Sequence, residues 1–342
     1  MRWSTQSVAV DGVPVGDGAL PGLQRIGFVR SIHTPQFAGM TFHEVLCKSA
    51  LNKLSEKATL PFRYTVNGYR GCSHGCRYCF ARPSHQYLDF DCGRDFDTQI
   101  VVKVNVAEVL RAELHRPSWR RETVALGTNT DPYQRAEGRY ALMPGIICAL
   151  AESGTPFSIL TKGSLLQRDL ALLVEAAAQV PLSVAVSLAV GDPELHRDVE
   201  PGTPTPQARL GLIAAIRAAG LDCHVMVAPV LPYLTDSVAH LDGLLGQIAA
   251  AGASSATVFG LHLRGTTRGW FMSWLAGSHP ELVRSYRELY RRGAYLPLEY
   301  RQMLQQRVKP MLARYRLAVS RRSSRLPTGP VAMPEPVQQA LF

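Results

Sequence analysis

The residues with the clearest potential for chemistry are three cysteines in a short loop that contains two glycines. Cys72, Cys76 and Cys79 follow one another at C-x3-C-x2-C spacing. Thiolates this close bind one metal centre without distant ligands, and three are one fewer than the four of an ordinary [4Fe–4S] site. Gly71 and Gly75 let the backbone adopt dihedral angles that a Cβ atom forbids. The spacing therefore predicts a [4Fe–4S] cluster with one iron open to a further ligand.

A structural zinc site is the alternative interpretation of the same loop. His74, His85 or Cys92 would then provide the fourth ligand. Zinc sites usually pair one closely spaced cysteine unit with a second C-x-x-C or H-x3–5-H unit, and the sequence contains no such second unit. The spacing favours the cluster, and zinc stays open as an alternative.

Short polar side chains follow the apolar runs that come after this loop. Thr128, Thr130 and Asp131 combine hydroxyl and acid groups that suit a zwitterion. Lys162, one of only six lysines, ends a second run, and its compact charge suits a carboxylate. Ser187 interrupts a third run, where a buried hydroxyl needs a hydrogen-bond partner. A capped turn, a surface lysine and a core serine are the structural alternatives.

The hydrophobic pattern predicts strands that alternate with helices. Six strand–helix units are expected, from the strand before the cysteines and the five strands after residue 122. Strands are expected in short continuous apolar runs, at residues 62–66, 99–104, 123–127, 156–161, 182–188, 222–227 and 256–263. Helices are expected at residues 43–58, 106–114, 144–152, 169–178, 207–219 and 237–251. Continuous apolar strands indicate a parallel sheet that is buried on both faces. An open doubly wound sheet and a partial (β/α)6 barrel both fit, and in either fold ligands bind at the carboxyl ends of the strands.

Five motifs in order along the chain carry a family resemblance. They are Cys72-x3-Cys76-x2-Cys79-Phe80-Ala81-Arg82, Thr130-Asp131-Pro132-Tyr133-Gln134, Thr161-Lys162-Gly163, Arg168-Asp169-Leu170 and Glu200-Pro201. Over about residues 60–265 the chain resembles the radical S-adenosylmethionine (SAM) superfamily, in the branch related to spore photoproduct lyase. It is nearest to uncharacterised bacterial relatives of that enzyme. The resemblance implies an α/β fold, a partial (β/α)6 TIM-like barrel. It also implies a [4Fe–4S] cluster and SAM, which is cleaved to methionine and a 5′-deoxyadenosyl radical.

The resemblance also implies which side chains contact SAM. It places the cofactor-binding residues beside the last cysteine and at the strand ends: Tyr78, Thr128, Thr130, Asp131, Lys162 and Ser187. Tyr78 or Phe80 would lie near the adenine. Glu200 would bind ribose hydroxyls or pair with Arg209, and the apolar segment 228–232 would pack against the adenine or within its own loop.

One region departs from the lyase. That enzyme returns a hydrogen atom from a cysteine near the end of its second barrel strand, where this chain reads Leu126-Gly127-Thr128. Cys92, Cys148 and Cys223 lie elsewhere, and we expect each to be a small buried residue. The resemblance therefore supports the fold and the cofactors more strongly than the lyase's substrate.

Positive charge is concentrated in one segment near the carboxyl end. Residues 264–325 hold 14 basic and 3 acidic residues, a net of +11 in a chain whose formal net charge is +10. Such a segment is typical of proteins with phosphate-bearing partners, and also of an ordinary solvated helix face. Aromatic residues among these arginines would either stack on bases or pack between helices: Trp270, Phe271, Trp274, Tyr286 and Tyr290.

The 342 residues divide into four expected parts. These are an N-terminal arm with a short helix at 1–58, the radical SAM core at 59–265, a basic helical extension at 266–325 and a flexible tail at 326–342. No apolar run resembles a signal peptide or is long enough to span a membrane. Seven cysteines with three in one loop do not suggest a disulfide framework, so we expect a cytoplasmic protein.

These patterns predict a radical enzyme that cleaves SAM and acts on an unidentified substrate. Nucleic acid is the leading candidate, and an electron donor such as flavodoxin or ferredoxin is the expected partner. The alternatives are a non-catalytic Fe–S or zinc protein that binds nucleic acid, and a radical SAM enzyme that modifies a protein or a small molecule. The sequence holds no second cysteine cluster for an auxiliary Fe–S centre, which makes several peptide-modifying families a poorer match.

Overall fold

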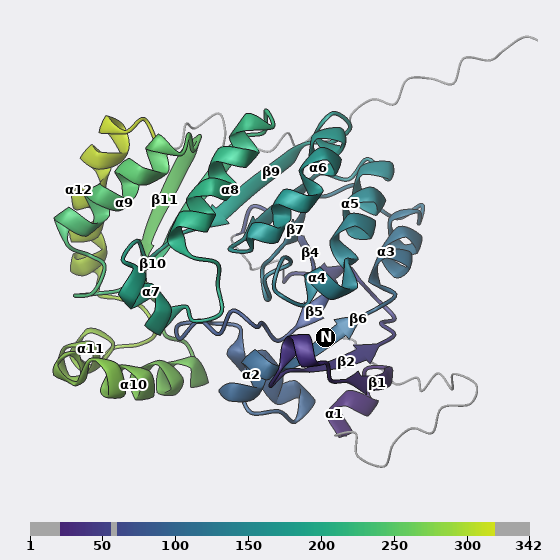
Figure 1. Cartoon of the computed structure of the whole chain (residues 1–342), viewed down its shortest axis with the longest axis horizontal. Helices are drawn as coiled ribbons and strands as arrows, with labels where there is room; N and C mark the ends of the chain where they lie inside the picture. Colours follow the sequence, from purple (N-terminus) through teal and green to yellow (C-terminus); the bar gives the residue numbers. More distant parts are fainter. Residues whose placement is uncertain (1–20, 56–59, 319–342) are drawn as a thin grey trace, which may run out of the picture.

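The computed structural model describes residues 21–55 and 60–318 of the chain. The described residues form two sheets, with helices packed around the larger one (Figure 1). The first twenty residues of the expected arm and the whole expected tail at 326–342 lie outside the described residues.

The larger sheet has seven strands in the order β11-β10-β9-β8-β7-β4-β3. Their bounds are β3 (Asn52–Lys53), β4 (Tyr64–Val66), β7 (Val124–Leu126), β8 (Phe157–Thr161), β9 (Leu182–Ser187), β10 (Cys223–Val230) and β11 (Ser255–Gly260). Neighbours pair in parallel except β3, which is antiparallel to β4. From β4 to β11, each parallel strand lies beside the strand of this sheet that follows it in the chain, and the direction of winding never reverses. This is the winding of a barrel, since a doubly wound sheet reverses at its centre. The partial barrel is therefore confirmed.

Helices connect these strands and cover the sheet. They are α3 (Val106–Leu114), α5 (Leu142–Glu152), α6 (Leu170–Ala177), α8 (Pro206–Ala218) and α9 (Val238–Ala250). Their buried leucine and isoleucine side chains join the strands in one hydrophobic core. Helix ends follow the local sequence: the Thr205 and Ser237 hydroxyls cap α8 and α9, and Gly154 and Gly220 follow α5 and α8 with positive φ angles. All five helices match the sequence prediction.

A smaller sheet lies beside the barrel in the order β1-β2-β6-β5. Its strands are β1 (Phe28–Ile32), β2 (Thr41–Val45), β5 (Tyr69–Arg70) and β6 (Gln99–Lys103). The expected helix at residues 43–58 is wrong, because this segment contains the end of β2 and all of β3. Every side chain of β2 is buried, and the strand pairs with β1 on one edge and β6 on the other. Pairing on both edges outweighs the apolar spacing that suggested a helix.

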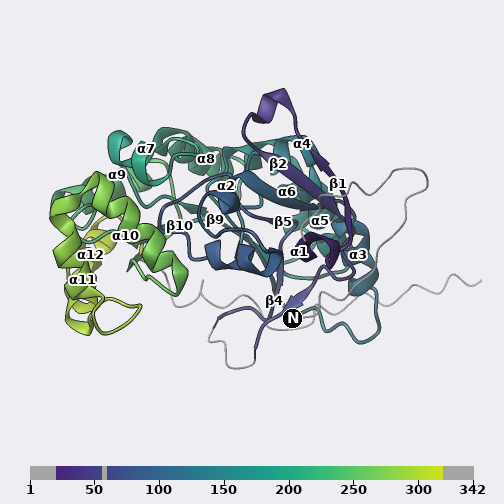
Figure 2. The same ribbon diagram turned by 90° about the horizontal axis from the view of Figure 1, so that it is seen from below.

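Three helices follow the barrel: α10 (Thr266–Ser278), α11 (Val283–Leu289) and α12 (Leu298–Arg314). They gather at the β11 end of the larger sheet, as both ribbon views show (Figure 2). Phe271, Tyr286 and Tyr290 are fully buried among them, and the two tyrosine hydroxyls donate to the backbone carbonyls of Pro232 and Leu261 at 2.8 Å. These three rings therefore pack between elements and present no face to a base.

The remaining helices are short. They are α1 (Pro21–Gln24), α2 (Arg94–Thr98), α4 (Glu137–Tyr140) and α7 (Pro193–Val199), with 3-10 turns at Pro35–Phe37, Arg82–Leu88, Ser164–Asp169 and Pro280–Leu282. Within residues 21–55 and 60–318, no helix combines the length and the apolar character that crossing a bilayer requires.

Candidate active site

A cavity of about 190 Å³ opens at the carboxyl ends of the barrel strands. Its lining includes all nine residues predicted from the sequence as ligands of the cluster or of SAM: Cys72, Cys76, Tyr78, Cys79, Thr128, Thr130, Asp131, Lys162 and Ser187. Ala228 and Pro229, from the expected adenine segment, line it as well. Residues from six successive strand ends therefore meet at one site.

The cluster loop, residues 71–79, is shaped by its own backbone. The Cys72 N–H donates to the Phe96 carbonyl at 2.9 Å, and the Cys79 N–H donates to the Cys76 carbonyl at 3.2 Å. Gly71 has a φ of +80°, and a Cβ atom there would lie 2.9 Å from the Gln99 carbonyl oxygen. Glycine is required at this position, as the sequence indicated.

Arg82 holds the middle of the cluster loop through hydrogen bonds to its backbone. Its side chain is fully buried and donates from Nη2 to the Cys76 carbonyl at 3.0 Å and from Nη1 to the Gly93 carbonyl at 2.7 Å. The same guanidinium pairs with Asp97 at 2.9 Å and lies 4.6 Å from the Trp270 ring centroid. The backbone position of Cys76 is thus held by the protein itself.

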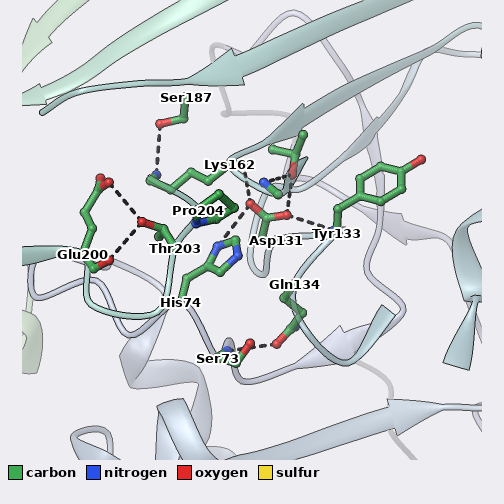
Figure 3. Close-up of polar contacts among 12 residues, drawn as sticks. Ser73, His74, Asp131, Tyr133, Gln134, Lys162, Ser187, Glu200, Thr203 and Pro204 are labelled. Carbon is green, nitrogen blue, oxygen red and sulfur yellow. Dashed lines mark hydrogen bonds and ion pairs between the residues drawn. The ribbon is translucent and has the colours of Figure 1, made fainter. Parts of the chain in front are cut away.

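Gln134 fastens the beginning of the cluster loop (Figure 3). Its buried amide accepts a hydrogen bond from the Ser73 N–H at 2.9 Å and donates one to the Gly71 carbonyl at 3.0 Å. Gln134 belongs to the motif Thr130-Asp131-Pro132-Tyr133-Gln134, but the sequence predicted no role for its side chain. Its adjacency to Asp131 along the chain was the only available signal.

The Asp131 carboxylate is surrounded by donors from its own protein. It accepts from the Thr161 hydroxyl at 2.5 Å, from the N–H groups of Lys162 and Tyr133 at 2.6 and 2.9 Å, and pairs with His74 at 3.4 Å (Figure 3). Burial alone would raise the pKa of Asp131, but His74 and these hydrogen bonds lower it to about 2. Asp131 therefore joins the ends of β7 and β8 to the cluster loop, and its contact with the SAM amino group stays a prediction.

Lys162 brings a cation into the cavity. Its Nζ donates to the Ser187 hydroxyl at 3.0 Å and lies 5.7 Å from the Tyr78 ring centroid. Burial would lower the pKa of Lys162, but Cys76 and Glu200 nearby raise it above the usual value. An ammonium has three donors, so Lys162 can bind an anionic ligand while it keeps its bond to Ser187.

Tyr78 is held by a buried ion pair behind the cavity wall. Its hydroxyl donates to Glu200, and Glu200 pairs with Arg209 at 2.5 Å. Burial would raise the pKa of Glu200, but Arg209 and Lys162 lower it to about 2. Of the two roles considered for Glu200, the structure contains the pair with Arg209, and the residues that line the cavity do not include Glu200.

The donor set of the cavity fits a cluster better than a zinc ion. His74 is paired with Asp131, and His85 Nε2 lies 2.8 Å from the Gln99 carbonyl oxygen, away from the cavity lining. Burial raises the pKa of Cys76 to about 12, so the metal must displace a proton when it binds this thiol.

The other cysteines lie outside the cavity. All seven are described and unpaired, and only those of the cluster loop appear in its lining. Cys223 begins β10 and so sits at the amino end of the barrel, away from the cavity, while Cys148 lies within α5. Cys223 is buried as expected, but that expectation is wrong for Cys148 and for Cys92, which lies in the turn before α2, because both are only partly buried. None of the three lines the cavity.

Comparison with known proteins identifies the family. Residues 66–243, just over half of the chain, match the model of the Radical SAM superfamily. The chain belongs to this superfamily. Over 342 residues it is 77% identical to an "Uncharacterized protein" of Mycobacterium tuberculosis and to one of Mycobacterium bovis, and covers 100% of each. A protein of Acidianus two-tailed virus, with the same description, is 28% identical over 62% of this chain and 71% of its own length.

Solved structures show the same fold. Spore photoproduct lyase complexed with dinucleoside spore photoproduct matches with a TM-score of 0.62 at 15% identity, over 90% of this chain and 85% of the lyase. A lyase variant with bound AdoMet and the same lesion matches with a TM-score of 0.58 at 14% identity, over 76% of each chain. These matches confirm the predicted lyase-like fold. Membership of the superfamily makes the chain a radical SAM enzyme and implies SAM and an iron–sulfur cluster as its cofactors.

Proposed function

We propose that this enzyme cleaves SAM reductively and transfers the resulting radical to a substrate. The observation that carries the proposal is a single cavity lined by three cysteine thiols and one lysine ammonium. Cys72, Cys76 and Cys79 would hold a [4Fe–4S] cluster, since three thiolates leave one iron open for SAM. Lys162 supplies the positive charge that suits the SAM carboxylate.

When bound, the cluster supplies the electron that splits SAM into methionine and a 5′-deoxyadenosyl radical. The residues of the chain bind and orient the reactants. Thr128 lies beside the cluster loop in the cavity wall, where its hydroxyl can contact the SAM amino group. Tyr78, fixed by its bond to Glu200, and the apolar surface of Ala228 and Pro229 enclose the space proposed for adenine.

An external one-electron donor of the flavodoxin or ferredoxin class would reduce the cluster before SAM is cleaved. The 5′-deoxyadenosyl radical then takes a hydrogen atom from the substrate and becomes 5′-deoxyadenosine. Among the described residues, no cysteine outside the cluster loop lines the cavity. The substrate radical therefore has no thiol of this chain in reach, and we propose a route different from that of the lyase.

The test is an anaerobic assay of the reconstituted protein. After addition of iron, sulfide, dithionite and SAM, we expect 5′-deoxyadenosine by chromatography, and none from Cys79→Ala. Cys148→Ala, which changes a cysteine of α5 outside the cavity, serves as the matched control and should keep the activity. Failure of the wild-type protein to assemble a cluster would restore the zinc alternative.

If a full cluster forms but no 5′-deoxyadenosine appears, the protein is either an enzyme that requires its substrate or a non-catalytic Fe–S protein. SAM-binding calorimetry distinguishes these two. A binding signal that Lys162→Ala weakens would indicate an enzyme that waits for its substrate. Lys162→Ala removes a charged donor from the cavity, so we expect SAM affinity to fall about tenfold. A protein that does not bind SAM would instead be a non-catalytic Fe–S protein, and the proposal would be wrong.

A further inference from the structure

The cavity has a second wall that differs from the cluster loop. Phe80, Phe259 and His262 line the cavity, together with the apolar side chains of Met226 and Leu261. Phe80 remains 54% exposed and Phe259 40% exposed. Large rings that stay exposed at a cavity opening are typical of a binding surface.

Three of the rings at this opening form a row that leads outward. The Phe80 and His262 ring centroids are 6.1 Å apart with an interplanar angle of 37°, and those of His262 and Tyr295 are 5.9 Å apart with an angle of 33°. Tyr295 is 52% exposed. Burial lowers the pKa of His262, with a smaller effect from Arg264, so the imidazole is uncharged at neutral pH. We call Phe80, Phe259, His262 and Tyr295 the aromatic mouth.

Backbone pairing builds this row from distant parts of the chain. His262 and Tyr295 form an antiparallel β-bridge, and the Leu263 N–H donates to the Ala294 carbonyl at 2.8 Å. The segment between α11 and α12 is thereby fastened to the end of β11. Arg292 lies three residues before Tyr295 in this fastened segment.

Two arginines belong to the chain segments that carry these rings, and one of them contacts the row. The Arg264 guanidinium carbon lies 4.9 Å from the Tyr295 ring centroid. Arg264 and Arg292 are both exposed, and within residues 21–55 and 60–318 neither has a carboxylate within 4.0 Å. Exposed rings and exposed arginines in the same segments match a ligand that alternates planar groups with negative charges.

We propose that the aromatic mouth binds single-stranded nucleic acid, with an unpaired base stacked on Tyr295 and His262 and a phosphate held by Arg264 and Arg292. The role of this surface in catalysis rests on the proposed function, since the bound strand would present its next nucleotide to the cavity. The charge distribution supports a polyanion: residues 264–325 carry a net charge of +11, while the whole chain carries +10. The row differs from the buried aromatic residues Phe271, Tyr286 and Tyr290, which offer no free face.

The test measures fluorescence anisotropy of a labelled single strand of about ten nucleotides, added to the reconstituted protein. Tyr295→Ala should weaken binding about tenfold, the loss of one stacked base. Arg264→Ala should weaken binding by a smaller factor and reduce the slope of affinity against salt by about one. Arg120→Ala is the matched control, because Arg120 is exposed in the segment before β7, at the amino end of the barrel.

Several results would overturn the proposal. These are no binding by the wild-type protein at low salt, equal affinities for the Tyr295→Ala and Arg120→Ala variants, or tighter binding of a duplex that Tyr295→Ala leaves unchanged. Binding of an acidic, aromatic-rich peptide without any binding of the oligonucleotide would assign the surface to a protein partner instead. Tyr295→Phe keeps the ring and should bind as the wild-type protein does.

The readouts also separate this proposal from the proposed function. The amount of 5′-deoxyadenosine formed without substrate should be the same for Tyr295→Ala and the wild-type protein, because Tyr295 is not among the residues that line the cavity. SAM cleavage without oligonucleotide binding would overturn only the proposal that the aromatic mouth binds nucleic acid. Oligonucleotide binding without SAM cleavage would overturn only the proposed function.

Discussion

The cluster loop and the aromatic mouth border the same cavity. They differ in how many partners their side chains have within the protein. Around the cluster loop, Arg82, Gln134, Asp131 and Glu200 are buried or nearly so, and each makes its hydrogen bonds to the protein itself. At the aromatic mouth, large rings and arginines remain exposed. The side chains that hold the cluster loop in place thus have partners within the protein, whereas the rings of the aromatic mouth remain partly uncovered.

This difference indicates a division of labour. A wall that is fully hydrogen-bonded before the cofactors arrive holds their ligands in place, and such preorganisation lowers the free energy needed to order the site. A wall of exposed rings is free to accept substrates of differing shape. We therefore expect substitutions near the cluster loop to alter folding and cofactor binding, and those at the mouth to alter substrate binding alone.

The largest effect should come from Cys76→Ala. Removal of one of the three thiolates leaves too few ligands for the cluster, so the visible absorbance and the SAM-cleavage activity should both disappear. Iron analysis and anaerobic absorbance spectra are the measurements, with Cys148→Ala as control. A variant that retained a full cluster would disprove the ligand assignment.

Arg82→Met should weaken folding strongly. It removes the buried partner of Asp97, two hydrogen bonds to the Cys76 carbonyl and one to the Gly93 carbonyl, which should lower the free energy of unfolding by about 3 kcal/mol. Urea denaturation monitored by circular dichroism measures the change. Tyr295→Ala, on the other wall, should change the same free energy by less than about 1 kcal/mol. If both substitutions lowered the free energy of unfolding equally, the proposed difference between the cluster loop and the aromatic mouth would be wrong.

Gly202→Ala tests the close contact between the cluster loop and the segment after Glu200. A Cβ atom at residue 202 would lie 2.0 Å from the Ser73 carbonyl oxygen, so the loop must move, at a cost of about 1 to 3 kcal/mol. Cluster content after reconstitution should fall as well. In the matched control Gly211→Ala, within α8, a Cβ atom would meet nothing within 4 Å, and alanine there should stabilise the helix by about 0.5 kcal/mol.

The smallest effect is the pH dependence contributed by Glu200. The pKa of Glu200 is lowered from 4.5 to about 2, so its contribution to stability is complete above the unfolded-state value and is lost as the pH falls toward 2. Glu200→Gln should therefore differ most from the wild-type protein near about pH 6 and less near about pH 3. Urea titrations at the two pH values test this, and a gap that widened toward acid would contradict it.

Much of the barrel and its site could be predicted from the sequence because the signals are local. The strands β7 to β10 are short continuous apolar runs, and the cysteine spacing alone predicts three ligands. Thr128, Lys162 and Ser187 could be assigned to one site because parallel strands bring their carboxyl ends to one edge. The structure places all three in one cavity lining.

The rest depended on contacts between residues that are distant in the chain. The helix expected at 43–58 is absent because β2 pairs with β6, more than fifty residues later, and no local spacing reveals such pairing. Gln134 could not be assigned to the cluster loop from its neighbours, since its partners Gly71 and Ser73 lie more than sixty residues earlier.

The sequence by itself determined which residues line the cofactor side of the cavity, because they lie close together in a short loop and at the ends of regular strands. Only the tertiary structure showed which rings come together in the aromatic mouth. Its rings come from residues 80, 259, 262 and 295, and the bridge between His262 and Tyr295 joins segments that no periodicity connects. Burial separated these exposed rings from Phe271, Tyr286 and Tyr290, and burial is a property of the folded chain.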